Sequence, residues 1–371
     1  MTRPPAWVHT GFAQRIVFGA GAAARLPEVL RATGARRWLL VTTAGRLASD
    51  DGARVVRTLG RSVVSTFDEV RSHVPTTAVE AAVRQARRDA IDGVISFGGG
   101  SCCDLGKAVC FFLEQESGAP GASWVDRPAI AHVTVPTTYS GAELTPHFGM
   151  TDEAAGAKTG AGGPTIAPLA AVYDPDLTLG TPVRVSAETG MNCIAHGVEV
   201  AYSPARTPEA EAVALACVAA AAGALPRVVD DPTDREARAD MLAAAALGGR
   251  ALQNGTIGVH HALSQLLGGR TGIAHGLANA VVLPHAMRFN QPAVPDELRR
   301  IGAALGDADD PAGAATRLLD RLGLPSRLRD CGVEEDDLDA VARLSAGHRG
   351  VQANPRPVGE EDARAILAEA F

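Results

Sequence analysis

The sequence predicts an α/β N-terminal domain built on a parallel sheet, followed by an all-α C-terminal domain. Three observations lead to this prediction. Short runs of aliphatic and β-branched residues alternate with amphipathic helical stretches in the first part of the chain. Long Ala-rich segments follow from about residue 186, with almost no β-branched runs. The length of 371 residues also exceeds what one hydrophobic core usually supports, so two domains are expected.

Four strands are expected in the N-terminal part. They are the runs Trp38–Thr42, Ser62–Phe67, Gly93–Phe97 and Val133–Val135, the last of which is ended by Pro136. Between them, Thr77–Ala90 predicts a helix, because it begins with Thr and its apolar residues recur at helical spacing. Strands that alternate with helices pair in parallel, and helices then cover both faces of the sheet.

The C-terminal part is expected to consist of helices. The predicted segments are Pro208–Leu225, Arg235–Asn254, Leu277–Met287, Pro295–Leu305 and several pieces after Pro311. Residues 150–185 are rich in Gly, Pro and Thr, which is typical of a crossing segment. We therefore place the two domains at residues 1–160 and 161–371.

Composition limits the class of ligand and the location. The net charge is -7 and Arg is scattered among acids, which argues against a nucleic-acid partner and favours a small molecule. The N-terminus lacks the apolar core of a signal peptide, and the most apolar run, Ala212–Leu225, is shorter than a bilayer span. No membrane partner and a cytoplasmic location are expected. The six cysteines include no Cys-x-x-Cys pair, so we interpret them as small buried hydrophobes.

A glycine-rich turn follows the third expected strand. The sequence Val94–Lys107 reads as a strand, then Gly98, Gly99 and Gly100, then a helix start with Ser101, Asp104 and Lys107. Glycines let the backbone approach a ligand closely, and a helix N-terminus adds a partial positive charge. The turn therefore predicts a pyrophosphate site of the Rossmann-like, dinucleotide-binding kind, although a tight strand-to-helix turn without a ligand has the same pattern.

A second polar loop follows the fourth strand. It contains Thr137 and Thr138, whose hydroxyls suit phosphate or ribose. Ligands of open parallel sheets collect beyond the carboxyl ends of the strands, so both loops should face one ligand. Alone, Thr-Thr after Pro is also common turn chemistry.

These motifs carry a family resemblance. The Gly-Gly-Gly-Ser-x-x-Asp-x-x-Lys turn, the Pro-Thr-Thr loop and the His-rich stretch that leads to His275-Gly-Leu-Ala-Asn-Ala-Val-Val-Leu-Pro-His285 resemble the iron-containing alcohol dehydrogenase superfamily. Within it, Val135–Pro146, Val172–Thr178 and Gly190–Glu199 resemble the maleylacetate reductase branch. The resemblance implies the architecture shared with dehydroquinate synthases: a nucleotide-binding domain, a helical catalytic domain and an active site in the cleft between them. It also implies a homodimer.

The resemblance assigns cofactor residues. It implies NADH or NADPH, with the pyrophosphate on Gly98, Gly99, Gly100 and Ser101, and with Thr137, Thr138 and Lys158 along the rest of the cofactor path. Asp104 and Lys107 are either cofactor contacts or a helix-surface ion pair. Many NAD-preferring relatives carry an acid after the first expected strand, where this chain has Thr43. Without that acid a 2′-phosphate is not repelled, so NADPH should be tolerated as well as NADH.

Histidines define the catalytic prediction. Metal-dependent relatives use an Asp and a His one helical turn apart with two further His residues; the matching positions here are Asn192, His196, His261 and His275. Asn is a poor substitute for an anionic ligand. Maleylacetate reductases resemble this chain in carrying Asn there, so we expect chemistry without metal. If a metal binds, its ligands would be His196, His261 and His275, since three imidazoles can hold zinc.

The implied reaction is the reduction of maleylacetate, a short unsaturated oxo-dicarboxylic acid of aromatic-ring degradation, to 3-oxoadipate. His196, His261 and His275 would donate to the enolate oxygen, while His260 and Asn192 orient the substrate. Gln265 stands where both branches usually carry a further His, and Gln cannot exchange a proton near neutral pH. A metal-dependent alcohol dehydrogenase, a lyase or cyclase relative, and a non-catalytic binding protein are the alternatives.

Overall fold

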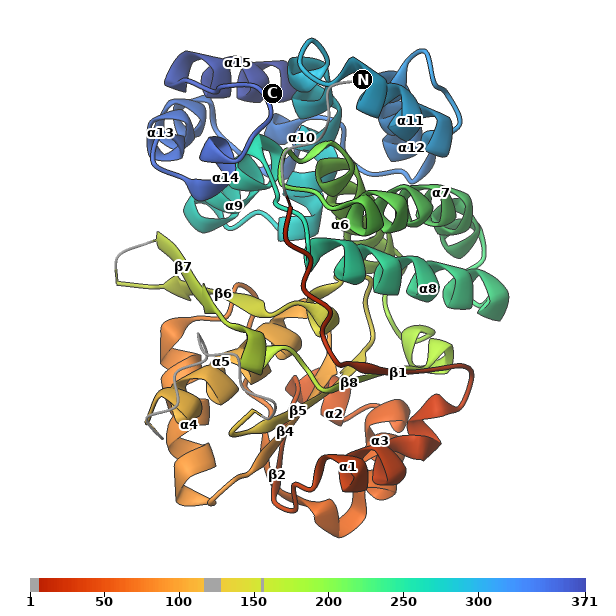
Figure 1. Ribbon diagram of the computed structural model, residues 1–371, viewed down its shortest axis with the longest axis vertical. Coiled ribbons are helices and arrows are strands. Elements are labelled where there is room, and N and C mark those ends of the chain that lie inside the picture. The colour runs from red at the N-terminus through yellow and green to blue at the C-terminus, as the bar shows by residue number, and fades with distance from the viewer. Residues whose placement is uncertain (1–6, 117–127, 155–156) are drawn as a thin grey trace. The chain divides into compact units, whose positions relative to one another are not determined.

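A computed structural model describes residues 7–116, 128–154 and 157–371. The chain forms two compact units (Figure 1). The first, which we call the sheet unit, comprises Gly11–Thr181, and the second, the helical unit, comprises Pro182–Phe371 with the start of the chain up to Thr10. The division between residues 181 and 182 lies later than the boundary expected between 160 and 161. The reason is a strand at Ala170–Tyr173 that belongs to the parallel sheet.

The sheet unit contains a six-stranded parallel sheet with the order β1-β8-β5-β4-β2-β3. Its strands are β1 (Arg15–Phe18), β2 (Trp38–Val41), β3 (Val63–Phe67), β4 (Gly93–Gly98), β5 (Ala131–Pro136) and β8 (Ala170–Tyr173). The four predicted strands are thus confirmed as β2 to β5. The strands β1 (RIVF) and β8 (AAVY), each four residues long, were not predicted.

Helices cover both faces of this sheet, as the alternating pattern predicts. Along β2, Trp38 and Leu40 pack into one hydrophobic cluster with Leu26 of α1, while Leu39 and Val41 pack into another cluster on the opposite face. The helices are α1 (Leu26–Thr33), α2 (Ala44–Leu47), α3 (Asp50–Leu59), α4 (Thr76–Arg88) and α5 (Gly100–Glu116). The expected helix Thr77–Ala90 corresponds to α4.

The expected crossing segment contains regular structure. β6 (His147–Asp152) and β7 (Ala157–Gly162) form a separate antiparallel pair. Gly149 faces Gly160 across this pair, and a Cβ added at Gly160 would lie 2.4 Å from the carbonyl oxygen of Phe148. The many glycines that indicated a loop therefore permit a close strand pair here.

The helical unit contains no strand in residues 182–371, which the structure describes in full. Its helices are α6 (Val183–Tyr202), α7 (Pro208–Asp230), α8 (Arg235–Leu252), α9 (Val259–Thr271), α10 (His275–Asn290), α11 (Pro295–Leu305), α12 (Pro311–Arg321), α13 (Glu335–Ser345), α14 (Arg349–Gln352) and α15 (Glu360–Ala370). Side-chain oxygens of Thr207 and Asp234 cap α7 and α8 by accepting backbone N–H bonds. The all-α prediction is confirmed.

Helix α7 is longer than the apolar run in the sequence suggests. It has 23 residues and a mean hydropathy of 1.9, so by length and composition alone it could cross a membrane. It packs against α6 and α8, and it buries Ala214, Cys217 and Val218. Core helices of globular proteins meet the same criterion, and 39% of the apolar window of α7 is buried within the described structure.

Candidate functional site

The two predicted nucleotide-binding loops meet at one edge of the parallel sheet. Val41 is paired with Ser96, and Gly98 with Pro136, so β2, β4 and β5 end side by side. Thr43 follows β2, Gly98 ends β4 and is followed by Gly99–Ser101, and Thr137 and Thr138 follow β5. The edge therefore collects residues from three separate segments, as expected for ligand sites of open parallel sheets.

The glycine turn is closely packed. Gly98 has a φ of 147°, and a Cβ there would lie 2.6 Å from Cys102 Sγ. A Cβ at Gly99 would lie 3.1 Å from Thr138 Cγ2, and one at Gly100 would lie 3.1 Å from Ser140 Cβ. The turn leads directly into the 17-residue helix α5, whose first amides point out of the helix end. These residues form a cradle whose backbone amides are available to an anion.

Thr138 offers the cradle a side-chain donor, whereas Thr137 is used structurally. The Thr138 hydroxyl is buried and has no hydrogen-bond partner among the described residues. It lies 3.2 Å from the position that a Cβ on Gly99 would take. Thr137 donates its amide to the Gly98 carbonyl at 2.9 Å, and its own carbonyl accepts from Thr181 Oγ1 at 2.7 Å. The orphaned hydroxyl beside the glycines fits a phosphate group.

Lys107 is not a cofactor contact. Its ammonium group is fully buried, 2.9 Å from Asp104 Oδ1, and it donates to the Ala142 carbonyl, to Thr145 Oγ1 and to the His147 carbonyl. It therefore ties α5 to the loop after β5. The expectation of a helix-surface pair is also wrong for this lysine, because three acceptors and a carboxylate enclose it.

Asp104 links the cradle helix to the antiparallel strand pair. Its carboxylate accepts the Gly149 amide of β6 at 3.3 Å. Lys158 lies on β7, opposite Thr151. Burial lowers the pKa of Lys158, and the charge of Asp104 partly opposes this shift. Lys158 and Asp104 are thus electrostatic neighbours beside the cradle.

Thr43 caps the short helix α2, and its backbone pairs with the backbone of an acidic residue. Its hydroxyl accepts the Arg46 amide at 3.2 Å, and its backbone forms an isolated bridge with Glu69. Asp68 and Glu69 line a groove with Ala44, Arg71 and Thr77. The position after β2 that lacks an acid therefore has two acidic residues close by, Asp68 and Glu69, which directly follow β3.

The predicted catalytic histidines gather in the helical unit. His196 comes from α6, His260 and His261 from α9, and His275 from the start of α10. The rings of His196 and His261 stack with centroids 4.7 Å apart and planes at 12°, while His275 is 6.1 Å from His261. We call these four residues the histidine cluster. Its members are separated by up to 79 positions, from His196 to His275, and the helix contacts α6·α10 and α9·α10 bring them together.

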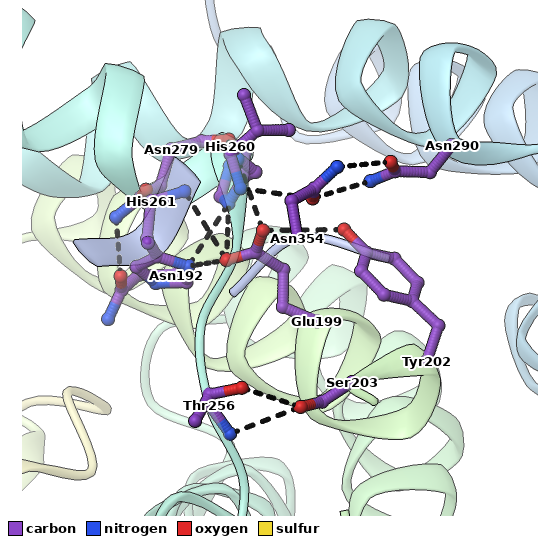
Figure 2. Close-up of polar contacts among 12 residues, drawn as sticks. Asn192, Glu199, Tyr202, Ser203, Thr256, His260, His261, Asn279, Asn290 and Asn354 are labelled. Carbon is purple, nitrogen blue, oxygen red and sulfur yellow. Dashed lines mark hydrogen bonds and ion pairs between the residues drawn. The ribbon is translucent and has the colours of Figure 1, made fainter. Parts of the chain in front are cut away.

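Asn192 joins the cluster through a residue that the sequence analysis did not single out. Asn279 on α10 donates its side-chain amide to Asn192 Oδ1 at 2.6 Å and contacts His275 Nε2 at 3.0 Å (Figure 2). Asn279 lies one turn after His275, so the i,i+4 spacing places both on one helix face. That spacing was visible in the sequence and would have identified it.

Glu199 is the second residue that the sequence analysis missed. It is fully buried, and its Oε2 lies 2.6 Å from His261 Nδ1 (Figure 2). Burial alone would raise the pKa of Glu199, but hydrogen bonds and charge from His260 and His261 outweigh it and hold the pKa well below its usual range. Glu199 stands seven positions after Asn192 and three after His196, which puts all three on one face of α6. This periodicity was the available signal.

The predicted metal ligands are not the ligand atoms that lie closest together. Among the described residues, the group of His, Cys, Asp or Glu ligand atoms that lie within 4.8 Å of one another is Glu199, His260 and His261. His196, His261 and His275 do not form such a group. His261 Nδ1 lies 2.6 Å from Glu199 Oε2, and Asn192 Oδ1 accepts a hydrogen bond from Asn279. Asn192 therefore supplies a neutral oxygen where an acid would supply an anionic one.

Gln265 and the remaining histidines lie on different elements of the two units. Gln265 is half-buried on α9, one turn after His261. His132 is buried and bonds Ser96 Oγ at 2.8 Å, and burial lowers its pKa to about 3. His348 caps α14. His285 lies inside α10, 3.6 Å from Glu369 on α15.

Comparisons with known proteins agree with this architecture. The sequence profile of iron-containing alcohol dehydrogenase matches residues 13–175, and that of the Fe-containing alcohol dehydrogenase family, C-terminal, matches residues 186–371. The maleylacetate reductase of Pseudomonas knackmussii is 35% identical over 98% of this chain and 97% of its own. Maleylacetate reductase 2 of Cupriavidus pinatubonensis is 37% identical over 96% of this chain and 94% of its own. The crystal structure of maleylacetate reductase from Agrobacterium tumefaciens has a TM-score of 0.86 and 34% identity, covering 99% and 98% of the two chains.

The chain therefore belongs to the iron-containing alcohol dehydrogenase superfamily and, within it, to the maleylacetate reductase branch. Members of this branch are reductases, so the chain is an oxidoreductase.

Proposed function

We propose that this protein is an NAD(P)H-dependent maleylacetate reductase that forms 3-oxoadipate without a metal ion. One observation carries the proposal: where metal-dependent relatives place an anionic ligand, Asn192 is bonded as a neutral amide to Asn279, beside three imidazoles. The similarity to maleylacetate reductases over nearly the whole chain supports the substrate class.

We assign cofactor binding to residues of the sheet unit and substrate chemistry to residues of the helical unit. In the sheet unit, Gly98–Ser101 and Thr138 would hold the cofactor pyrophosphate, with Lys158 near it. The nicotinamide, when bound, supplies a hydride to the alkene carbon next to the substrate carboxylate. In the helical unit, His196 and His275 would stabilise negative charge at the ketone oxygen with N–H donors. His260 and Asn192 would orient the substrate, and a proton would be added to the alkene carbon next to the ketone.

We propose NADH as the preferred cofactor, with NADPH accepted more weakly. Thr43 does not repel a 2′-phosphate, but Glu69 pairs with it through the backbone, and Asp68 and Glu69 line the groove with Ala44. Negative charge at this place would oppose binding of the extra phosphate. Glu69→Gln should therefore lower the dissociation constant of NADPH while that of NADH changes little, as measured by fluorescence titration. Equal changes for both cofactors would contradict this assignment.

The test of the function is nicotinamide absorbance with maleylacetate and each cofactor. Oxidation of NADH that depends on maleylacetate supports the proposal, and no oxidation of either cofactor overturns it. Full activity after chelation and dialysis supports the metal-free reaction, whereas activity that is lost with chelator and restored by zinc or iron indicates a metal-dependent alcohol dehydrogenase. We also propose that the protein is cytoplasmic and forms a homodimer. Light scattering of the purified protein tests the dimer by its mass.

A further inference from the structure

We propose that Glu199 is a positioning residue that fixes His261 with its proton on Nδ1, so that Nε2 is the nitrogen that transfers a proton in the reaction. This inference rests on the proposed function for its role in catalysis. Its structural part, the protonated nitrogen of His261, concerns the protein alone. It also makes His261 the proton donor in a protein that has Gln265 where relatives usually carry a further histidine.

The carboxylate of Glu199 can only accept hydrogen bonds. Its Oε2 lies 2.6 Å from His261 Nδ1, so the proton between them belongs to the imidazole. The same carboxylate accepts the backbone amides of His260 at 3.1 Å and His261 at 3.3 Å, and the Tyr202 hydroxyl at 3.3 Å. With four donors around it, the buried carboxylate is held in one orientation.

His260 leads to the same assignment by an independent contact. Its Nε2 lies 2.8 Å from the carbonyl oxygen of Asn279, which can only accept, so Nε2 carries a proton. In neutral His260, Nδ1 is then an acceptor, and it lies 3.1 Å from His261 Nδ1. Both neighbours of His261 Nδ1 are therefore acceptors, and a single proton on that nitrogen satisfies them.

The backbone leaves room for this arrangement at Gly258. A Cβ there would lie 2.9 Å from Glu199 Oε1 and 2.7 Å from Asn354 Oδ1. Gly258 directly precedes α9, and the lack of a side chain at this position lets the start of the helix lie close to the carboxylate. The first turn of α9, which carries both histidines, therefore packs against the Glu199 carboxylate.

The arrangement determines what His261 can do. With Nδ1–H bonded to Glu199, the opposite nitrogen, Nε2, gains a proton from water, because the carboxylate stabilises the imidazolium. It then gives that proton to the alkene carbon next to the ketone as the hydride supplied by NADH adds to the other alkene carbon. The product is the saturated oxo-acid, the cofactor leaves oxidised, and His261 returns to its neutral Nδ1–H form. Glu199 remains a carboxylate throughout.

The structural part is tested by ¹⁵N NMR of histidine side chains in the purified, ligand-free protein, with His261→Gln used to assign the signal. We expect neutral His261 to carry its proton on Nδ1 in the wild type and to lose this preference in Glu199→Gln. A wild-type His261 that is protonated on Nε2 overturns the proposal. This measurement needs no substrate, so it decides the inference even if maleylacetate is not the substrate.

The catalytic part is tested by kinetics of Glu199→Gln and Glu199→Asp, with Glu369→Gln as the control, since Glu369 contacts His285 and no member of the histidine cluster. We expect Glu199→Gln to lower kcat by on the order of 10²–10⁴-fold, the scale seen when a carboxylate that orients a catalytic histidine becomes an amide. KM and cofactor affinity should change little, Glu199→Asp should recover part of kcat, and Glu369→Gln should retain nearly all of it. An unchanged kcat per folded molecule in Glu199→Gln, with only a lower melting temperature, would show a purely structural role and overturn the proposal.

Discussion

Two fully buried glutamates, one in each unit, have opposite electrostatic character. Glu143 lies under the loop after β5, and its carboxyl accepts hydroxyl groups from Tyr173 at 3.0 Å and Ser140 at 3.4 Å. Burial raises its pKa to about 7, and these hydrogen bonds only partly oppose the shift. Glu199 is equally buried, but hydrogen bonds and charge from His260 and His261 outweigh burial and hold its pKa well below the usual range.

The comparison shows that the donors around a buried acid, and not burial alone, decide its charge. Near the cradle, hydroxyl donors and the charge of Lys107 only partly oppose the effect of burial, so the pKa of Glu143 stays raised. In the helical unit, Glu199 remains an anion that can support a cationic imidazole. The two regions therefore suit different tasks: holding an anionic ligand in one and moving a proton in the other.

The largest effect is expected for His261→Asn in the helical unit. Loss of the imidazole should lower kcat by on the order of 10²–10⁴-fold, because no other group bonds Glu199 in the same way. Cofactor affinity should be unchanged, since the proposed cradle is in the sheet unit. Steady-state kinetics and fluorescence titration of cofactor measure the two effects, and His285→Asn is the control. A variant that loses cofactor binding as well would contradict the division between the units.

The next largest effect concerns stability and separates the two glutamates. The pKa of Glu143 rises from its ordinary value of 4.5 to about 7 on folding, so the folded state binds more protons than the unfolded state in this range. Its contribution should therefore lower the free energy of unfolding by up to about 3 kcal/mol as pH rises from 4.5 to 7. Glu143→Gln should remove this loss and be more stable than the wild type at pH 8.

The matched variant Glu199→Gln should behave in the opposite way. A lowered folded pKa stabilises the protein above the unfolded pKa, and this contribution is lost as pH falls. Glu199→Gln should therefore be less stable than the wild type at pH 7. Urea unfolding of both variants at pH 5 and pH 8 gives the comparison. If both variants changed the free energy of unfolding in the same direction at pH 8, the hydrogen-bond donors around the two glutamates would not determine their charges.

A smaller effect is expected for Gly98→Ala in the cradle. The φ of 147° and the contact with Cys102 Sγ make any side chain strained there. Strain of about 1–3 kcal/mol in the turn should weaken cofactor binding by roughly 10–100-fold. Gly149→Ala is the control, since a Cβ there meets nothing within 4 Å. Unaltered cofactor affinity in Gly98→Ala would remove the cradle from the proposed cofactor site.

The smallest effect is expected for Gln265→His. An added imidazole one turn after His261 should raise kcat by roughly tenfold or less, because His261 already supplies a proton in our proposal. A larger rise would transfer the role of proton donor to position 265. A fall in kcat would show that the pocket is adapted to Gln265 instead.

The sequence predicted the parts of this molecule that are local. The strands β2 to β5 and the glycine turn after β4 each lie in one continuous segment, and apolar patterning or glycine spacing identifies them. β1 and β8 are short, and they become strands because they pair with each other and β8 with β5. No pattern inside either segment specifies that pairing.

The site shows the same limit. Asn192, His196, His261 and His275 were identified through motif resemblance, and the structure brings the three histidines together. Glu199 and Asn279 were not identified, although their helical spacing to His196 and His275 was visible, because the contacts that give them a role, to His261 and to Asn192, cross between helices. Lys107 was misjudged because a lysine on an amphipathic pattern usually faces water, and here carbonyl groups of the following loop enclose it.

The burial of Lys107 has a practical consequence for handling this protein. The chain has only two lysines, Lys107 and Lys158. Lys107 is fully buried, and Lys158 has a lowered pKa, which increases the fraction of its amine that is uncharged and reactive. Amine-directed dyes or resins that react with lysine side chains should therefore attach at Lys158, beside the proposed cofactor cradle, so coupling through carboxylates or an added tag is the better choice for immobilising the enzyme.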